Sequence, residues 1–171
     1  MDPLLLLLRL LHIVLGSLWV GIIVFNAVFL GPTVAELGPD GGKVMGALQR
    51  RGMMTFLPAI GLLTLLSGAW LLYEASLGFE GAYFRSGPGH AYSMGGGLAI
   101  VGFLLGIGVM RPAMLRVMAI AQGMAQVTDE ATRAARQAEM QRLRARASLM
   151  GRVVAVLLVV ATAAMAVARY L

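Results

Sequence analysis

The stretch RLLHIVLGSLWVGIIVFN, residues 9–26, places arginine, histidine, tryptophan and asparagine within an otherwise apolar run. With the residues on either side, it forms an apolar segment long enough to cross the ~30 Å hydrocarbon core of a bilayer as one helix. At 100° per residue, nearly every polar or small group of the run falls within an arc of about 80°, a stripe made of His12, Gly16, Trp19, Ile23 and Asn26. Because a polar group that faces lipid is costly, we expect this stripe to face the interior of a helix bundle.

The composition of the whole chain is that of a membrane protein. Its 171 residues are 59% hydrophobic and 13% charged, and MDPLLLLL lacks the basic n-region of a signal peptide, so we expect it to stay as part of the first span. Four apolar segments predict membrane-spanning helices, at about residues 4–30, 53–73, 92–110 and 152–168. We therefore expect an all-α, polytopic membrane four-helix bundle that forms a single integral membrane domain over residues 1–171. The absence of cysteine excludes disulfides, thiolate metal sites and cysteine nucleophiles.

The three connections differ in character. The first span is expected to end at Gly31-Pro32, and the loop that follows has room for a short amphipathic helix. The second connection is rich in aromatic residues that fit an interfacial belt. The third, residues 111–149, predicts a long helical hairpin with a break near residues 123–128, where Thr128 reads as an N-cap followed by acidic residues. From there one helix of roughly 40 residues, ~60 Å long, is expected to run into the fourth span.

The distribution of basic residues predicts the orientation. Ten of them lie in the first and third connections: Lys43, Arg50, Arg51, Arg111, Arg116, Arg133, Arg136, Arg142, Arg144 and Arg146. The opposite side carries Arg9, Arg85 and Arg169. Basic residues accumulate in cytoplasmic loops, so we expect a bacterial inner-membrane protein with both termini periplasmic and the hairpin in the cytoplasm. This topology accounts for the net charge of +6, and we expect no nucleic-acid partner.

The two histidines are the candidate metal ligands, because this topology puts both near the periplasmic end. If the hydrocarbon begins just after Arg9, His12 and His90 lie at similar depth. If it begins at Leu4, His12 lies ~12 Å deep, and Met94, one turn beyond His90, becomes the better partner. Either pair can supply the axial ligands of a haem iron.

Arg9 and Trp19 complete the set of candidate cofactor-binding residues. Arg9 lies one turn before His12, where it could meet a haem propionate or simply extend to the interface. In the alternative interpretation, His12 hydrogen-bonds a backbone or Ser/Thr group of a neighbouring helix, and Trp19 and Asn26 serve packing in the same way.

Small residues elsewhere predict close helix packing. Gly95, Gly102 and Gly106 share one stripe of the third span, and Thr64 and Gly68 of the second span are interpreted in the same way. The methionines Met110, Met114 and Met118 recur at every fourth position. Thioethers suit Cu(I), but the same pattern is expected of the buried face of an amphipathic helix.

The segment LHIVLGSLWVG, residues 11–21, resembles the first-helix motif H-[IV]-x-x-G-x-x-W-[VI]-G of small four-helix membrane proteins in the CopD-like copper-resistance group and of relatives of the HemJ-type protoporphyrinogen oxidases. The last 21 residues, 151–171, resemble the final helix of bacterial members of this assemblage. In HemJ-type proteins the first-helix histidine, which matches His12, is associated with b-type haem. This chain lacks the lysine-containing later motif of that family, since its only lysine, Lys43, lies in a loop.

These observations predict an integral membrane protein that binds a b-type haem or a related redox cofactor near the periplasmic face and serves electron transfer or haem or copper handling. No constellation of catalytic residues is evident, so an enzyme is not expected, although a membrane oxidoreductase is an alternative. The other alternative is a cofactor-free accessory or structural subunit, within a homo-oligomer or a larger membrane complex.

Overall fold

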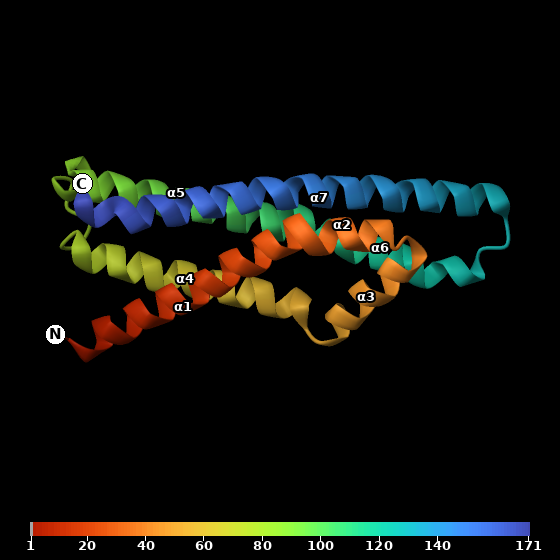
Figure 1. Cartoon of the computed structure of the whole chain (residues 1–171), viewed down its shortest axis with the longest axis horizontal. Helices are drawn as coiled ribbons and strands as arrows, with labels where there is room; N and C mark the ends of the chain where they lie inside the picture. Colours follow the sequence, from red (N-terminus) through yellow and green to blue (C-terminus); the bar gives the residue numbers. More distant parts are fainter. Residues whose placement is uncertain (1) are drawn as a thin grey trace.

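The computed structural model describes residues 2–171, except for the side chain of Pro39, and this part of the chain is helical with short connections (Figure 1). The α-helices are α1 (Pro3–Phe25), α2 (Gly31–Glu36), α3 (Pro39–Arg50), α4 (Met53–Ala75), α5 (Gly87–Leu105), α6 (Arg111–Gly123) and α7 (Glu130–Val167). Short π-helical segments, η1 (Asn26–Leu30) and η3 (Gly106–Met110), join α1 to α2 and α5 to α6. 3₁₀ turns occupy Tyr83–Arg85, Met124–Gln126 and Ala168–Tyr170.

Four continuous helical stretches are long and apolar enough to cross a membrane: Pro3–Glu36, Met53–Ala75, Gly87–Gln126 and Glu130–Tyr170. The predicted all-α fold with four such helices is therefore confirmed and is compatible with a multi-pass membrane protein. The single long helix expected after the break is confirmed as well, because α7 has 38 residues.

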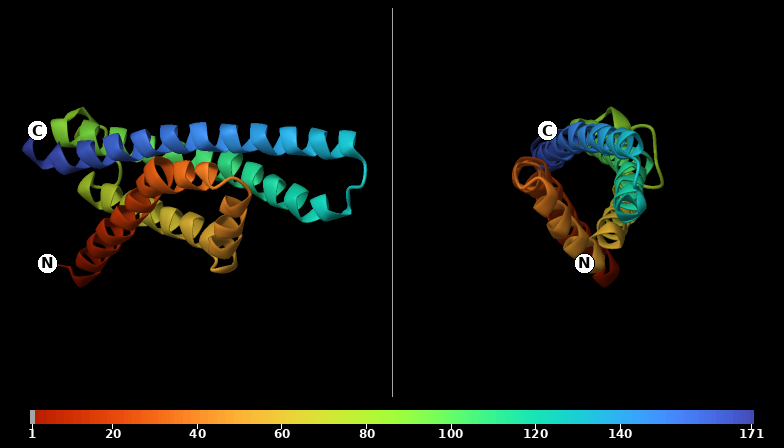
Figure 2. Two further views of the ribbon diagram at one scale, coloured as in Figure 1. Left: turned by 45° about the vertical axis from the view of Figure 1, so that its right-hand side comes forward. Right: turned by 90° about the vertical axis from the view of Figure 1, so that its right-hand side faces the viewer.

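The bundle is built from two helix pairs. α7 runs the length of the molecule with α5 and α6 along it, and α1 packs across α4 (Figures 1 and 2). Contacts of α4 with α5 and of α1 with α7 join the pairs, and both termini lie at the same end. Buried residues from all four long helices form the core between the pairs: Trp19, Ile23, Ile60, Ala99, Val154, Ala155, Leu158 and Ala161.

Glycine permits the close contact between α5 and α7. A Cβ at Gly95 would lie 2.9 Å from Cγ of Met165 and 3.0 Å from the carbonyl oxygen of Ala161. Gly102 faces Leu158 in the same way. Gly106, expected on the same packing stripe, has open space where its Cβ would be, so its assignment to the contact was wrong. The Gly106 amide still donates to the Gly102 carbonyl, so Gly106 keeps its place on the α-helical stripe, and α7 lies farther from the backbone at this level.

Besides Pro58 within α4, Pro32 and Pro112 lie inside long continuous helices, contrary to the expected ends at Gly31-Pro32 and at Met110. A proline lacks the N–H for an i→i−4 hydrogen bond, and its ring clashes with the carbonyl four residues earlier. In both cases the five residues before the X-Pro pair adopt a π-helical turn, η1 before Gly31-Pro32 and η3 before Arg111-Pro112. The wider turn moves the carbonyl away, so the helix continues past the proline.

The hairpin of α6 and α7 is held together at its tip. Asp129, rather than Thr128, is the N-cap of α7, and its carboxylate accepts a hydrogen bond from the Thr132 amide. Hydrogen bonds from Thr132 lower the pKa of Asp129 below the usual aspartate value. Arg133 and Arg136 of α7 donate to the carbonyls of Val127 and Gly123, and so cap the end of α6.

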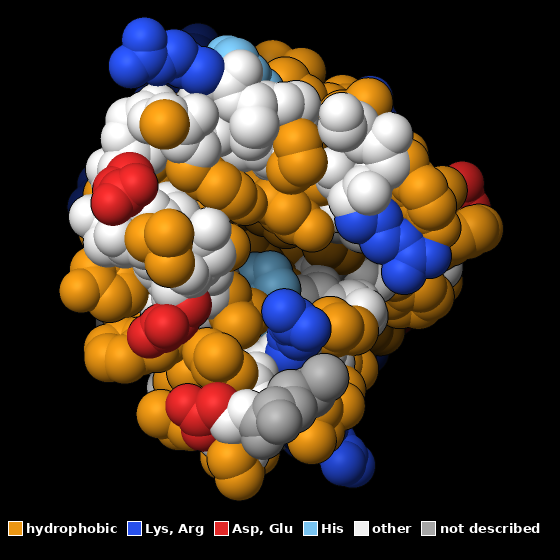
Figure 3. Space-filling model, turned by 90° about the vertical axis from the view of Figure 1, so that its left-hand side faces the viewer, with side chains coloured by type: hydrophobic (Ala, Val, Ile, Leu, Met, Phe, Trp, Pro, Cys, Tyr) orange, Lys and Arg blue, Asp and Glu red, His pale blue; other side chains and the backbone are white. Residues whose placement is uncertain are grey.

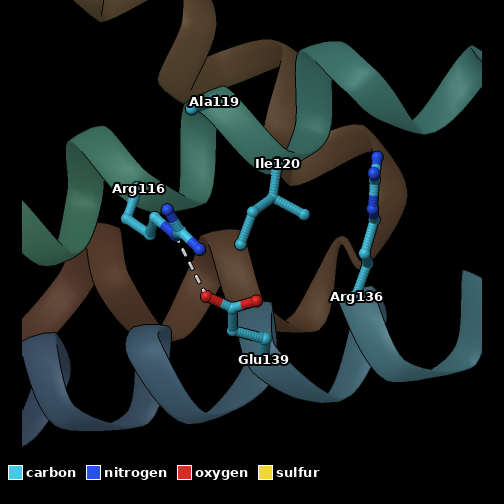
Figure 4. A pocket seen from close by; sticks show the side chains of 5 residues that line it. All are labelled: Arg116, Ala119, Ile120, Arg136 and Glu139. Atoms are coloured by element: carbon cyan, nitrogen blue, oxygen red, sulfur yellow. Dashed lines mark hydrogen bonds and ion pairs between the residues drawn. The ribbon is translucent and has the colours of Figure 1, made fainter. Parts of the chain in front are cut away.

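A cross-helix ion pair lies further along the same hairpin. Nε of Arg116 on α6 lies 3.0 Å from Oε1 of Glu139 on α7 (Figure 4). Arg136 extends away from Glu139 on the other side of Ile120, and the space between these side chains is a shallow cavity of about 250 Å³. Because both charged partners are exposed, the pair contributes little to the stability of the hairpin.

The close α5–α7 contact leads to a first prediction. Gly95→Ala adds a methyl group against the α7 backbone and should lower the free energy of unfolding by about 1–3 kcal/mol. The matched control is Gly97→Ala on the same helix, where a Cβ meets open space and alanine should be neutral or stabilising by up to about 1 kcal/mol. Denaturant unfolding in detergent micelles measures both, and equal stabilities would contradict the packing described.

Candidate functional site

The polar stripe of α1 faces α4, as predicted. A Cβ at Gly16 would lie 3.3 Å from Cγ2 of Thr64, and one at Gly61 would lie 3.1 Å from the indole of Trp19. Trp19 and Ile23 are buried, with 4% and 8% of their surfaces exposed. Asn26, at the deep end of the stripe, is half-buried at the start of η1.

His12 is fixed by two groups of α4. Its Nδ1 lies 2.9 Å from the carbonyl oxygen of Thr64 and 3.4 Å from the hydroxyl oxygen of Ser67. The Ser67 hydroxyl donates to backbone carbonyls of its own helix, so both groups act as acceptors toward His12. Nδ1 therefore carries the hydrogen in the neutral ring, and Nε2 carries the lone pair.

The imidazole of His12 packs against Gly68 of α4. A Cβ at Gly68 would lie 2.6 Å from Cε1 of His12, so the ring lies directly against the α4 backbone. No described residue hydrogen-bonds Nε2. A ring with Nδ1–H on a backbone carbonyl and Nε2 free has the arrangement of metal-ligating histidines. The same contacts satisfy the alternative, in which His12 hydrogen-bonds a neighbouring helix.

A hollow opens at the end of the bundle that carries both termini. Figure 3 looks onto this end and shows a histidine and a basic side chain at the border of the hollow. The Trp19–Phe103 contact, with ring centroids 6.0 Å apart, closes the bundle about 10 Å deeper than His12, because seven residues of α1 separate Trp19 from His12.

The wall opposite His12 is provided by α5. Phe103 of α5 contacts Gly61 of the antiparallel α4. Seven residues from this contact toward the termini, α4 reaches Gly68 and α5 reaches Gly96, so these two glycines lie at the same level. Seven residues make nearly two helical turns, so Gly96 and Phe103 lie on the same face of α5. No atom lies within 4 Å of where a Cβ at Gly96 would be, so this wall leaves room for a ligand.

His90 and Met94 are not brought to His12. Met94 is nearly level with His12, but it lies nine residues, or two and a half turns, before Phe103 and so on the opposite face of α5. Its side chain is 53% exposed. His90 is exposed and about 9 Å nearer the end of the bundle than Gly96, with Nδ1 3.0 Å from the Ser86 carbonyl of its own helix. A shared metal with either residue stays a prediction.

The other candidate residues occupy different surroundings. Arg9 is exposed one turn from His12 toward the end of the helix, and no described residue pairs with it. Trp19 belongs to the core. Met110, Met114 and Met118 are half-buried beside the face of α6 that is fully buried by Ala113, Val117 and Ile120. Among residues 2–171 no group of three or more His, Cys, Asp or Glu side chains is placed to hold a metal ion.

Sequence reasoning identified Thr64 and Gly68 as packing residues but missed Ser67 as a partner of His12. The sequence did contain a signal for Ser67, because it is a hydroxyl residue within an apolar span and lies on the same helical turn as Thr64 and Gly68. The Thr64 carbonyl carries no sequence signal.

Comparisons of the chain with protein-family models, with curated proteins and with solved structures found no match.

The contact between His12 and Gly68 leads to a second prediction. Gly68→Ala should displace the imidazole and break its hydrogen bond to the Thr64 carbonyl. Nitrogen-15 spectra of labelled histidine should report the Nδ1–H tautomer for His12 in the unsubstituted protein and a mixture of tautomers in Gly68→Ala. Gly21→Ala is the control, because a Cβ at Gly21 meets open space. An unchanged His12 signal in Gly68→Ala would show that the ring does not lie on α4.

Proposed function

We propose that this chain is a multi-pass protein of the bacterial inner membrane in which His12 ligates a b-type haem or a comparable redox cofactor in the hollow near the periplasmic end. The single observation that carries the proposal is the fixed imidazole of His12, with Nδ1–H on the Thr64 carbonyl and Nε2 without a protein partner. The Nε2 lone pair is thus available to a metal ion while Nδ1–H keeps the ring on α4.

The membrane orientation is supported by where the charges lie. The end of the bundle with the hollow carries few basic residues, whereas the α3 and α6–α7 regions carry most of them. By the positive-inside rule, the hairpin is cytoplasmic and the hollow opens toward the periplasm.

The residues of the hollow would have distinct tasks. His12 Nε2 would hold the iron of the cofactor, and the Thr64 carbonyl would raise the basicity of the ring through Nδ1–H. Arg9 is near enough in the sequence to pair with a propionate. Trp19 and Phe103 would exclude water from below. A bound haem supplies one-electron transfer, with a potential tuned by its ligands and their hydrogen bonds. The second ligand is not assigned.

A second candidate is a cofactor-free subunit of a membrane complex. The large exposed surface of α1 favours it. Only 6% of the residues in the apolar window of α1 are buried, against 33% in that of α7. In this case His12 serves the α1–α4 contact alone, and lipid or another subunit covers the outer face of α1.

The third prediction separates these candidates. Protein purified from cells supplied with a haem precursor should show a Soret band, and His12→Ala should abolish it, because the substitution removes the proposed Nε2 ligand. His90→Ala is the control that removes the other histidine, and it should reduce the band only if His90 is the second ligand.

A colourless preparation that remains folded by circular dichroism would contradict haem binding and favour the cofactor-free subunit. A Soret band of full intensity in His12→Ala would equally contradict the assignment of the ligand.

A further inference from the structure

Five arginines lie within about 9 Å of one another along the long axis of the molecule: Arg50, Arg51, Arg111, Arg146 and Arg152, here called the basic belt. A Cβ at Gly151 would lie 3.3 Å from Cε of Met110, so the next residues, Arg152 and Arg111, flank a direct contact of α7 with η3. Arg146 follows about 9 Å further along α7.

The short helix α3 brings the remaining two arginines to the same level. Phe103 contacts Gly61 across the antiparallel helices α5 and α4. Seven residues further along α5 and η3 is Met110, and seven residues back along α4 is Met54, so the two are level. Arg50 and Arg51 immediately precede α4 and therefore lie at the level of Arg111 and Arg152.

The belt has no counter-charge within the described part of the chain. All five side chains are exposed, and none makes an ion pair or a side-chain hydrogen bond with residues 2–171. No Asp or Glu lies within six positions of any of them in the sequence. Five unpaired guanidinium groups this near one another repel unless anions lie between them.

Three arginines nearer the tip of the hairpin have partners within the protein. Arg116 pairs with Glu139, and Arg133 and Arg136 cap the end of α6. Arg142 and Arg144, between these arginines and the belt, are exposed and make no such contact with the described residues, so they provide a matched control.

We infer that the basic belt binds the headgroups of anionic phospholipids in the leaflet that it faces. The inference rests on the proposed membrane embedding and is independent of haem. The arginines of the belt stand at one end of the uninterrupted apolar sequence of α4, of α5 with η3, and of α7, which in the proposed embedding is the depth of the phosphate groups. Guanidinium forms bidentate hydrogen bonds with phosphate, and attraction to an anionic surface falls off within a Debye length of about 8–10 Å. Arg146 lies within that distance of Arg152 along α7, whereas Arg144 and Arg142, at about 12 and 15 Å, lie beyond it.

The fourth prediction uses the whole chain in phosphatidylcholine vesicles that contain a trace of spin-labelled phosphatidylglycerol or phosphatidylcholine. The ratio of their association constants should favour phosphatidylglycerol by about fivefold or more at low salt and decline as salt is raised. Arg146→Gln/Arg152→Gln should bring the ratio toward one. The control Arg142→Gln/Arg144→Gln removes the same charge from the same helix beyond the Debye length and should leave the ratio unchanged.

Each other outcome has a defined meaning. An immobilised lipid population with no preference for phosphatidylglycerol, or with a preference that Arg142→Gln/Arg144→Gln reduces as much as Arg146→Gln/Arg152→Gln, would overturn the belt and leave the embedding intact. A complete lack of immobilised lipid would overturn the embedding on which the belt depends.

Discussion

The close contact of α1 with α4 is the constraint on which the arrangement of the site depends. An interhelical hydrogen bond within a membrane contributes only about 0.6 kcal/mol on average, so the bond from His12 to the Thr64 carbonyl orients the ring more than it holds the helices. What holds them is the shape of the interface, where Gly16 and Gly68 let a threonine and an imidazole approach the opposite backbone. The hydrogen bond then determines which ring nitrogen stays free.

The two pairs of helices diverge from this contact toward the ends of the chain. Trp19 and Phe103 close the space between the pairs in the middle of the bundle, and toward the termini the pairs separate to leave the hollow. At the other end the two π-helical turns carry the first and third apolar helices past their prolines, so that α6 extends beyond the core beside α7. The molecule therefore has the hollow at one end and the protruding α6–α7 hairpin at the other.

The orientation of α1 could be predicted from the sequence, because a polar group in an apolar helix is costly unless it faces the interior of the bundle. That argument correctly turned the His12 stripe inward, although it did not identify α4 as the helix that the stripe contacts. The ends of the helices were harder to predict, because a proline normally ends a helix. No sequence pattern before Pro32 or Pro112 indicates a π-helical turn. Whether Met94 could be a partner of His12 depended on the rotation of α5 about its own axis, which a single sequence does not specify. In the structure this rotation directs Met94 away from His12. The position of a backbone carbonyl, here that of Thr64, has no sequence signal at all.

The inward orientation of the α1 stripe is the central claim, and cysteine cross-linking tests it most directly, since the chain has no cysteine of its own. A Cβ at position 16 would lie 3.3 Å from Cγ2 of Thr64, which is one bond from the Thr64 Cβ. Gly16→Cys/Thr64→Cys therefore brings the two Cβ atoms close to the ~3.5–4.5 Å separation found in a disulfide. It should form an intramolecular disulfide rapidly on mild oxidation in the membrane. Gly21→Cys/Thr64→Cys, with one thiol on the open face of α1, should not. Equal cross-linking of both pairs, or of neither in folded protein, would contradict the account.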